Sequence, residues 1–197
     1  MVKLKNIIMK KILINIIFIL VLTKSSYAND IKSFEIAGIS IGERLLNHYS
    51  EKVIKDKIKN GYFYKGNKYV DVFFSVNDKS SGYETLQITI NPEDKNFIIE
   101  SVAGQIEYKN NMKECMKKKK IIVSELESFF DKKFENNYGA HAIDKSGESK
   151  VDQSMLFIQG SPVRVECYDW SKKYTYTDKL LISIQSEKFE QFLKNAY

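Results

Sequence analysis

The sequence predicts an α+β domain in which an antiparallel sheet carries helices on one face. Strand-like segments with alternating apolar residues follow one another across short turns, which is typical of antiparallel sheets. Segments with helical spacing lie before, between and after these groups of strands. Prolines number only two in 197 residues, and no linker divides the chain. We therefore expect one domain over residues 29–197, with about six strands in one sheet or two and the order ααβββαβββα.

Two short helices are expected at the start of this domain. The first is predicted at about Gly42–Tyr49. Ser40 and Glu43 precede it with the S-x-x-E spacing of a capping box, in which each side chain bonds the other residue's backbone N–H. The same serine matches G-x-S-x-G, but a nucleophile elbow needs several strands before it. Ser50 then caps a second helix, which ends at Asn60.

Three strands follow the helices. Apolar residues alternate with polar ones over Tyr69–Val76 and Glu84–Ile90, and a longer strand is predicted at Phe97–Tyr108. Residues rich in Asn, Asp, Ser and Gly join these segments, as in an antiparallel meander. Gly104 lies inside the third strand and is predicted to mark a bulge.

The longest helix is expected from Asn110 or Asn111 to about Phe134. Its lysine run, Lys117–Lys120, spreads around the helix and predicts a solvated face rather than an anion site. The polar segment Glu135–Asp152 has no periodicity and is interpreted as a loop.

The C-terminal part is expected to form a hairpin, one more strand and a helix. The hairpin strands are Gln153–Gln159 and Val163–Tyr168, joined at Gly160. A strand at Leu180–Gln185 and a helix at Ser186–Ala196 complete the pattern. Each half of the chain thus runs as a helix followed by three strands.

The first 28 residues predict a cleavable export signal. A positively charged start is followed by an apolar run, Ile12–Leu22, and by small residues at Ser26 and Ala28. Eleven apolar residues span about 16 Å as a helix, whereas a bilayer core needs roughly 30 Å. A retained anchor is the alternative. We expect the mature chain to be periplasmic or secreted and to lack an integral membrane span.

Removing this signal leaves a nearly neutral chain. The whole sequence has 31 basic and 25 acidic residues, but its first 28 residues hold five lysines and no acid. The remainder therefore has 26 basic and 25 acidic residues. A nucleic-acid-binding protein needs a basic domain or a basic face, so the bulk charge argues against that class.

Cys115 and Cys167 are the only cysteines and are predicted to form a structural disulfide. Exported chains with two cysteines most simply pair them. Cys115 lies on the apolar side of the long helix, and Cys167 shares a strand face with Val163 and Val165. Free buried thiols and a redox pair are the alternatives, although no C-x-x-C motif is present.

The candidate acid–base residues are His141, Asp144 and Glu148, which lie together in the polar segment. A histidine beside a carboxylate can transfer protons, so a small hydrolase-like enzyme is one hypothesis. The alternative is that these three residues are exposed on a loop and have no function. His48 is the only other histidine, and neither its spacing nor the cysteines form a zinc motif. No metal or cofactor is therefore predicted.

Aromatic residues near the C-terminus are the candidate binding residues. Trp170, Tyr174 and Tyr176 fall within seven residues of each other. Such clusters stack on sugars or anchor protein partners, although strands also bury aromatic residues.

Two stretches and one cysteine resemble a group of small, uncharacterised exported proteins from AT-rich marine bacteria. They are Phe34–Leu46, Arg164–Trp170 and the helix residue Cys115. A fainter likeness is to small α+β lipoproteins of outer-membrane barrel assembly, whose lipidated cysteine this chain lacks. The first resemblance implies export and no known activity.

The sequence therefore predicts a non-catalytic periplasmic domain that binds a protein partner or another envelope component. A hydrolase-like enzyme and a small-ligand-binding protein are the alternatives.

Overall fold

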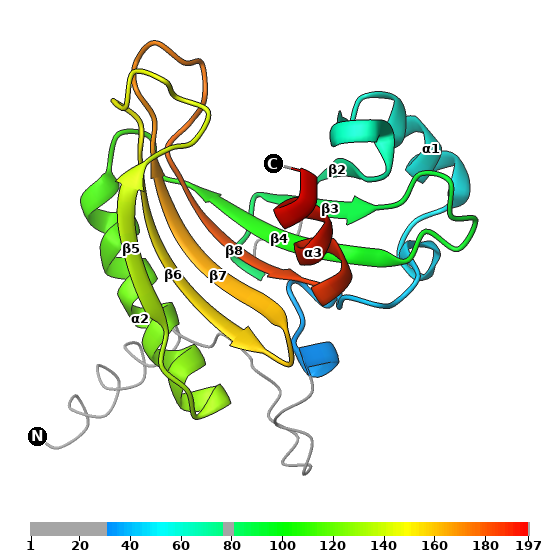
Figure 1. Cartoon of the computed structure of the whole chain (residues 1–197), viewed down its shortest axis with the longest axis horizontal. Coiled ribbons are helices and arrows are strands. Elements are labelled where there is room, and N and C mark those ends of the chain that lie inside the picture. Colours follow the sequence, from blue (N-terminus) through cyan, green and yellow to red (C-terminus); the bar gives the residue numbers. More distant parts are fainter. Residues whose placement is uncertain (1–30, 77–80, 197) are drawn as a thin grey trace, which may run out of the picture.

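Eight antiparallel strands form one continuous sheet in the computed structural model, which describes residues 31–76 and 81–196 (Figure 1). This confirms the α+β class and corrects the expected six strands and the expected order of elements. The strand order across the sheet is β1-β2-β3-β4-β8-β7-β6-β5. The helices are α1 (Glu51–Lys59), α2 (Met112–Phe130) and α3 (Glu187–Ala196), and the strands are β1 (Tyr62–Phe63), β2 (Val70–Ser75), β3 (Thr85–Ile90), β4 (Ile99–Glu107), β5 (Glu135–Ala140), β6 (Lys150–Ile158), β7 (Ser161–Asp169) and β8 (Lys179–Gln185).

The sheet consists of two halves with the same order of elements. In each half a helix precedes four antiparallel strands: α1 with β1–β4, and α2 with β5–β8. The last strand of each half, β4 or β8, lies in the centre, and the two pair from Ser101↔Gln185 to Glu107↔Lys179. Each half therefore has one strand more than the sequence pattern indicates.

Both additional strands lie at the outer edges of the sheet and have weak sequence signals. The strand β1 is only two residues long. The strand β5 occupies part of the predicted loop, and five of its six residues are exposed. Because neither side of β5 is buried, its sequence has no alternation of apolar and polar residues.

The segment before α1 is built mainly of turns, isolated bridges and short 3-10 helices rather than an α-helix. Only Leu45–Asn47 form a short 3-10 helix within the predicted Gly42–Tyr49. The backbone N–H of Gly42 bonds Ile99, which holds this segment against the sheet. Half of the expected capping box forms, since Glu43 accepts a hydrogen bond from the Ser40 N–H. The predicted cap of α1 is confirmed, because the Ser50 side chain accepts from the Val53 N–H.

Gly104 lies in a regular part of β4 and does not form a bulge. It pairs with Leu86 on one side and Ile182 on the other. A Cβ atom at this position would lie 2.4 Å from the Tyr83 ring. Glycine is needed here because the tyrosine ring packs directly on the backbone.

Helices lie on both faces of the sheet, which corrects the expectation of one covered face. Cys167 of β7 is bonded to Cys115 of α2, with the two Cα atoms 6.1 Å apart, which confirms the predicted disulfide. Arg164 of the same strand pairs with Glu190 of α3 at 2.7 Å. Residues three apart in a strand point to opposite faces, so α2 and α3 lie on opposite sides of β7, as Figure 1 shows.

The face that carries α1 and α2 contains the apolar core and is called the helix face. Val72, Ile88, Val102, Ile184 and Val165 extend across it from β2 to β7 and are fully buried. The opposite face is called the polar face, and α3 covers only part of it.

The predicted signal peptide and its cleavage site lie outside the described residues, so they stay predictions. Within residues 31–76 and 81–196, no helix is long and apolar enough to cross a bilayer. The disulfide is consistent with an oxidising, exported location.

Candidate functional site

A row of polar side chains crosses six strands of the polar face. Each member forms a hydrogen bond with the next, except that Lys179 and Glu166 interact through their charges. The bonds include Gln87 Nε2 to Asp71 Oδ2 at 2.7 Å and Gln105 Nε2 to Gln87 Oε1 at 2.9 Å. The polar row consists of Asp71, Gln87, Gln105, Lys179, Glu166 and Gln153.

Asp71 forms one end of the polar row and has a full set of partners. Its carboxylate accepts hydrogen bonds from Tyr64 at 2.8 Å, Gln87 at 2.7 Å and Thr89 at 2.5 Å. Burial raises the pKa of Asp71, and these three donors lower it in part. This end is therefore a closed structural network.

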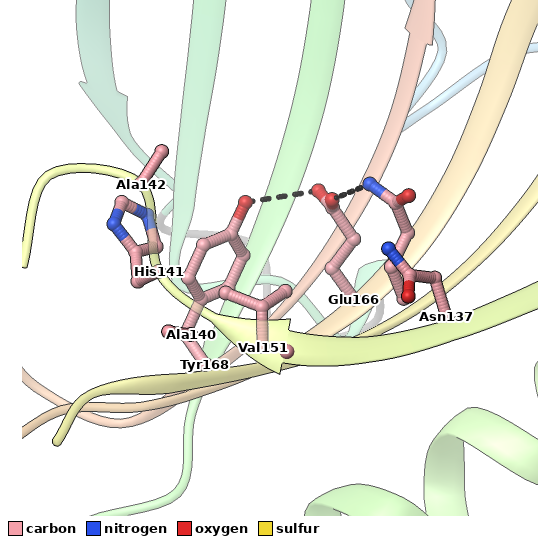
Figure 2. Close-up of a pocket in the computed structure, with 9 residues that line it drawn as sticks. Asn137, Ala140, His141, Ala142, Val151, Glu166 and Tyr168 are labelled. Atoms are coloured by element: carbon pink, nitrogen blue, oxygen red, sulfur yellow. Dashed lines mark hydrogen bonds between the residues drawn. The ribbon is translucent and has the colours of Figure 1, made fainter. Parts of the chain in front are cut away.

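Glu166 lies toward the other end and has fewer partners. Its carboxylate accepts from Gln153 Nε2 at 2.5 Å and from the Tyr168 hydroxyl at 3.0 Å. The residue is 6% exposed, and it borders a hollow with a cavity volume of about 240 Å³. Figure 2 shows His141, Tyr168 and Glu166 next to one another along this hollow. The hollow is lined by Asn137, Gly139, Ala140, His141, Ala142, Val151, Gln153, Glu166 and Tyr168.

Burial shifts the pKa values of two groups beside Glu166, the Tyr168 hydroxyl and the Lys179 ammonium. Burial, followed by the nearby Glu166 carboxylate, raises the pKa of Tyr168 well above its ordinary value, so the hydroxyl stays protonated and donates. Burial lowers the pKa of Lys179, while Glu166 opposes that shift. The Lys179 ammonium lies 5.7 Å from the centre of the Tyr168 ring.

His141 lies at the rim of the hollow as a neutral ring. Its Nδ1 accepts a hydrogen bond from the Ile143 N–H at 3.2 Å. Since Nδ1 is an acceptor, the proton of the neutral ring is on Nε2. Burial lowers the pKa of His141, and the charge of Glu166 is the largest of the effects that oppose this shift. The imidazole therefore has no free lone pair with which to take a proton.

The two carboxylates that the sequence placed with His141 bind their own loop region instead. Asp144 accepts from the Ser146 hydroxyl at 2.6 Å and from the backbone N–H groups of Ser149 at 2.7 Å and Ser146 at 2.9 Å. Hydrogen bonds from Ser146, first through its side chain, and from Ser149 hold the pKa of Asp144 far below the usual range. Glu148 accepts from the Ser171 hydroxyl at 2.7 Å and Lys173 at 2.5 Å.

These bonds connect the loop after β5 with the loop between β7 and β8. The Ser171 N–H donates to the Ser149 hydroxyl at 3.0 Å, and the Tyr174 hydroxyl lies 3.4 Å from Asp144. The two loops lie side by side in Figure 1. Asp144 and Glu148 thus hold one wall of the site in place.

The predicted aromatic cluster forms and packs behind His141. Trp170 lies 4.5 Å from the His141 ring and 4.7 Å from Tyr176, centre to centre. Tyr174 and Tyr176 are stacked at 5.7 Å. None of Trp170, Tyr174 and Tyr176 lines the hollow, and Tyr176 is 55% exposed. The cluster contacts the site through Trp170, which lies next to His141 and is stacked on Tyr168 at 5.9 Å.

A second hollow of about 400 Å³ lies between α2 and the strands β5 and β6 on the helix face. Lys119 lines it and is only 4% exposed, which differs from the expected solvated lysine run. Its ammonium pairs with Asp152 at 2.5 Å. Within the described part of the chain, no three histidines, cysteines or acidic residues are grouped so that they could hold a metal ion.

The sequence reasoning missed most residues of the first hollow. Gln153 belongs to β6, and Glu166 and Tyr168 occupy alternate positions of β7, whose other face is apolar. The only sequence signal for these residues is that they are polar or charged. Solvent-facing strand positions accept any residue, so this signal does not distinguish a site from an ordinary surface. Asn137 belongs to β5, which was interpreted as a loop.

Comparisons with known proteins find no match: no family model, curated protein or solved structure is similar to the chain. The resemblance to exported marine bacterial proteins therefore stays a prediction.

Proposed function

We propose that this protein is a non-catalytic, exported binding domain that holds a donor-bearing group of an envelope component in the first hollow. The observation that carries the proposal is the Glu166 carboxylate at the hollow. It accepts only two hydrogen bonds from neutral described groups, Gln153 and Tyr168, whereas an ionised carboxylate offers about four acceptor positions.

The protonation states at the hollow favour binding over acid–base catalysis. A general base needs a free lone pair near the substrate, and the Nδ1 atom of His141 is already used by Ile143. Tyr168 has a raised pKa and remains a donor. Asp144 and Glu148 are engaged in loop contacts. The hydrolase-like hypothesis therefore has less support than binding.

The chemistry of the lining favours a small ligand rich in hydroxyl or amino groups. Glu166 is the only acidic residue in the lining, and Asn137 and Gln153 supply amide groups. The cavity is smaller than the roughly 300–1,000 Å³ of sites for drug-sized ligands. It fits a single ring or a short chain, such as one unit of a glycan or the head of an amine.

The test is calorimetric titration with glucosamine, glucose and glucuronate as probes. Glucosamine is expected to bind best and glucuronate worst, because Glu166 attracts a cation and repels a carboxylate. Glu166→Gln should weaken glucosamine binding by at least about tenfold, since hydrogen bonds to charged groups contribute about 1.5–3 kcal/mol.

Glu107→Gln is the matched control, because Glu107 lies on the same face outside the hollow. It should leave the affinity unchanged. Equal binding of all three probes, or equal loss in both variants, would contradict the proposal.

A further inference from the structure

The outer edge of β5 has the backbone pattern of an open strand-addition site. The N–H of His141 donates to the carbonyl of Ser149 at 2.9 Å, directly beyond the β5–β6 ladder. In an antiparallel pair, residues bonded to the partner alternate with residues whose backbone groups point away. Asn136, Tyr138 and Ala140 therefore direct their N–H and C=O groups outward.

The strand β5 has few features that protect an edge from pairing, and its one charged residue, Glu135, lies at its first position. Natural edge strands are protected by shortness, proline, lysine or bulges. The strand β5 has six residues, no proline or lysine, and a regular register with β6. Its Tyr138 is 66% exposed. By contrast, β1 at the opposite edge of the sheet has only two residues.

Hollows lie on both faces of the sheet next to β5. The first hollow uses Asn137 and Gly139 on the polar face, and the second uses Asn136 on the helix face. Side chains of an added strand alternate between these two faces. In strand-addition complexes, main-chain bonds supply affinity and pockets for alternate side chains supply specificity.

The two faces beside β5 have opposite charge preferences. The second hollow is lined by Lys120 and by two acids whose charges are already offset, since Asp152 pairs with Lys119 at 2.5 Å and Glu127 pairs with Lys133 at 2.7 Å. Lys113 and Lys117 lie seven and three residues before Lys120, on the same side of α2. All three are exposed and are called the lysine flank. On the polar face, Glu135 and Glu166 are the nearest acids. Acidic side chains of an added strand thus fit the helix face, and donor-bearing side chains fit the polar face.

We infer that the edge of β5 binds an extended segment of a partner protein in which acidic residues alternate with donor-bearing residues such as Thr, Ser or Lys. The inference rests in part on the proposed function, since the donor-bearing side chains would lie on the side of the first hollow. A second copy of the chain fits less well. Two copies paired through β5 would bring their lysine flanks together on one face, where like charges repel.

The probe is a fluorescent eight-residue peptide of alternating Asp and Thr, followed by anisotropy with the full disulfide-bonded protein. It should bind, and a peptide of alternating Lys and Thr should bind several-fold more weakly. Methylation of alternate backbone nitrogens should abolish binding of the acidic peptide, because it removes strand hydrogen bonds and keeps every side chain. Lys120→Glu should weaken the acidic peptide several-fold.

Tyr138→Pro is the decisive variant of the protein. The Tyr138 N–H points away from β6, so proline there blocks addition of a strand but keeps the β5–β6 ladder. We expect at least about tenfold weaker peptide binding and an unchanged melting temperature. Tyr138→Thr, which keeps the N–H and the strand preference, is the matched control and should bind nearly as well as the wild type.

Several outcomes would overturn the inference. They are no binding of the acidic peptide, binding that survives both N-methylation and Tyr138→Pro, or a dimer of the chain that Tyr138→Pro dissociates. The methylated peptide tests the inference even where the proline variant does not fold. Failure here is distinct from failure of the proposed function, because glucosamine binding depends on Glu166 and not on Tyr138.

Discussion

The two halves of the sheet share an order of elements, but the buried carboxylate of each half has a different set of hydrogen-bond partners. Asp71 in the first half accepts three hydrogen bonds and belongs to a closed network. Glu166 in the second half accepts two and borders a hollow. The difference shows that the same order of elements surrounds one carboxylate with donors and leaves the other beside a hollow, where we propose that a ligand binds.

The halves also differ in how their polar face and edge are covered. Phe189 of α3 packs on Tyr64 and Tyr69 at 5.2 and 5.0 Å, so the helix covers the first half near Asp71. The first hollow lies in the second half and is lined by residues of β5, β6 and β7 and of the loop after β5. The second half also has the disulfide and the longer helix. The disulfide therefore ties the second half to α2 on the helix face, on the side opposite the first hollow.

The largest predicted effect is loss of the disulfide, which would weaken the second half. Replacing Cys115 and Cys167 with alanine should lower the free energy of unfolding by about 4 kcal/mol, from the entropy of a loop closed across 52 residues. Urea unfolding of both proteins measures the loss. A stability that is equal with and without reductant would show that the halves do not depend on this bond.

A middle-sized effect is expected from Asp71, the anchor of the first half. Asp71→Ala leaves Tyr64, Gln87 and Thr89 without their acceptor and should cost about 1–3 kcal/mol. Asp71→Asn keeps an acceptor and removes the charge. Because burial raises the pKa of Asp71, ionisation removes stability as the pH rises through that pKa, so the amide variant should be close to wild type at neutral pH.

Chemical denaturation at neutral pH compares the two Asp71 variants, and binding of glucosamine should be unchanged in both. If Asp71→Ala is as stable as the wild type, or if it loses glucosamine binding, then Asp71 does not have the purely structural role that distinguishes it from Glu166.

The smallest effect is the pH dependence contributed by His141. Burial lowers its pKa below the ordinary value of about 6.5, so the unfolded chain binds a proton first as the pH falls. The stability contributed by the neutral ring is complete above about pH 6.5 and is lost as the pH falls through the folded-state pKa.

Urea midpoints at about pH 7.5 and 5.5 measure this loss. His141→Asn should show a smaller decrease than the wild type, because the ring whose pKa is lowered by burial is absent. An identical decrease in wild type and His141→Asn would place the titrating group elsewhere.

Local features of the fold could be predicted from the sequence because neighbouring residues determine them. Ser50 caps α1, and alternation identified the apolar faces of β2, β3 and β7. The disulfide could also be predicted, because both cysteines lie on buried faces of regular elements.

The candidate site could be predicted only in part, because its residues meet through strand register. Asp71 and Lys179 belong to one row but are far apart in sequence, and no local pattern links them. The strand β5 is stabilised by pairing with β6 rather than by burial. His141 was identified, and the carboxylate with the largest electrostatic effect on it is Glu166 of the hollow, followed by the predicted Asp144.

The central position of β8 has a consequence for synthesis. A ribosome delivers the chain from its N-terminus, so β4 is complete while its neighbour in the sheet, β8, is not yet made. Until α2 and three further strands have followed, one edge of β4 remains unpaired, and such edges attract other chains. Nascent or truncated chains that end before Lys179 should therefore aggregate, even though every residue of the first half is present.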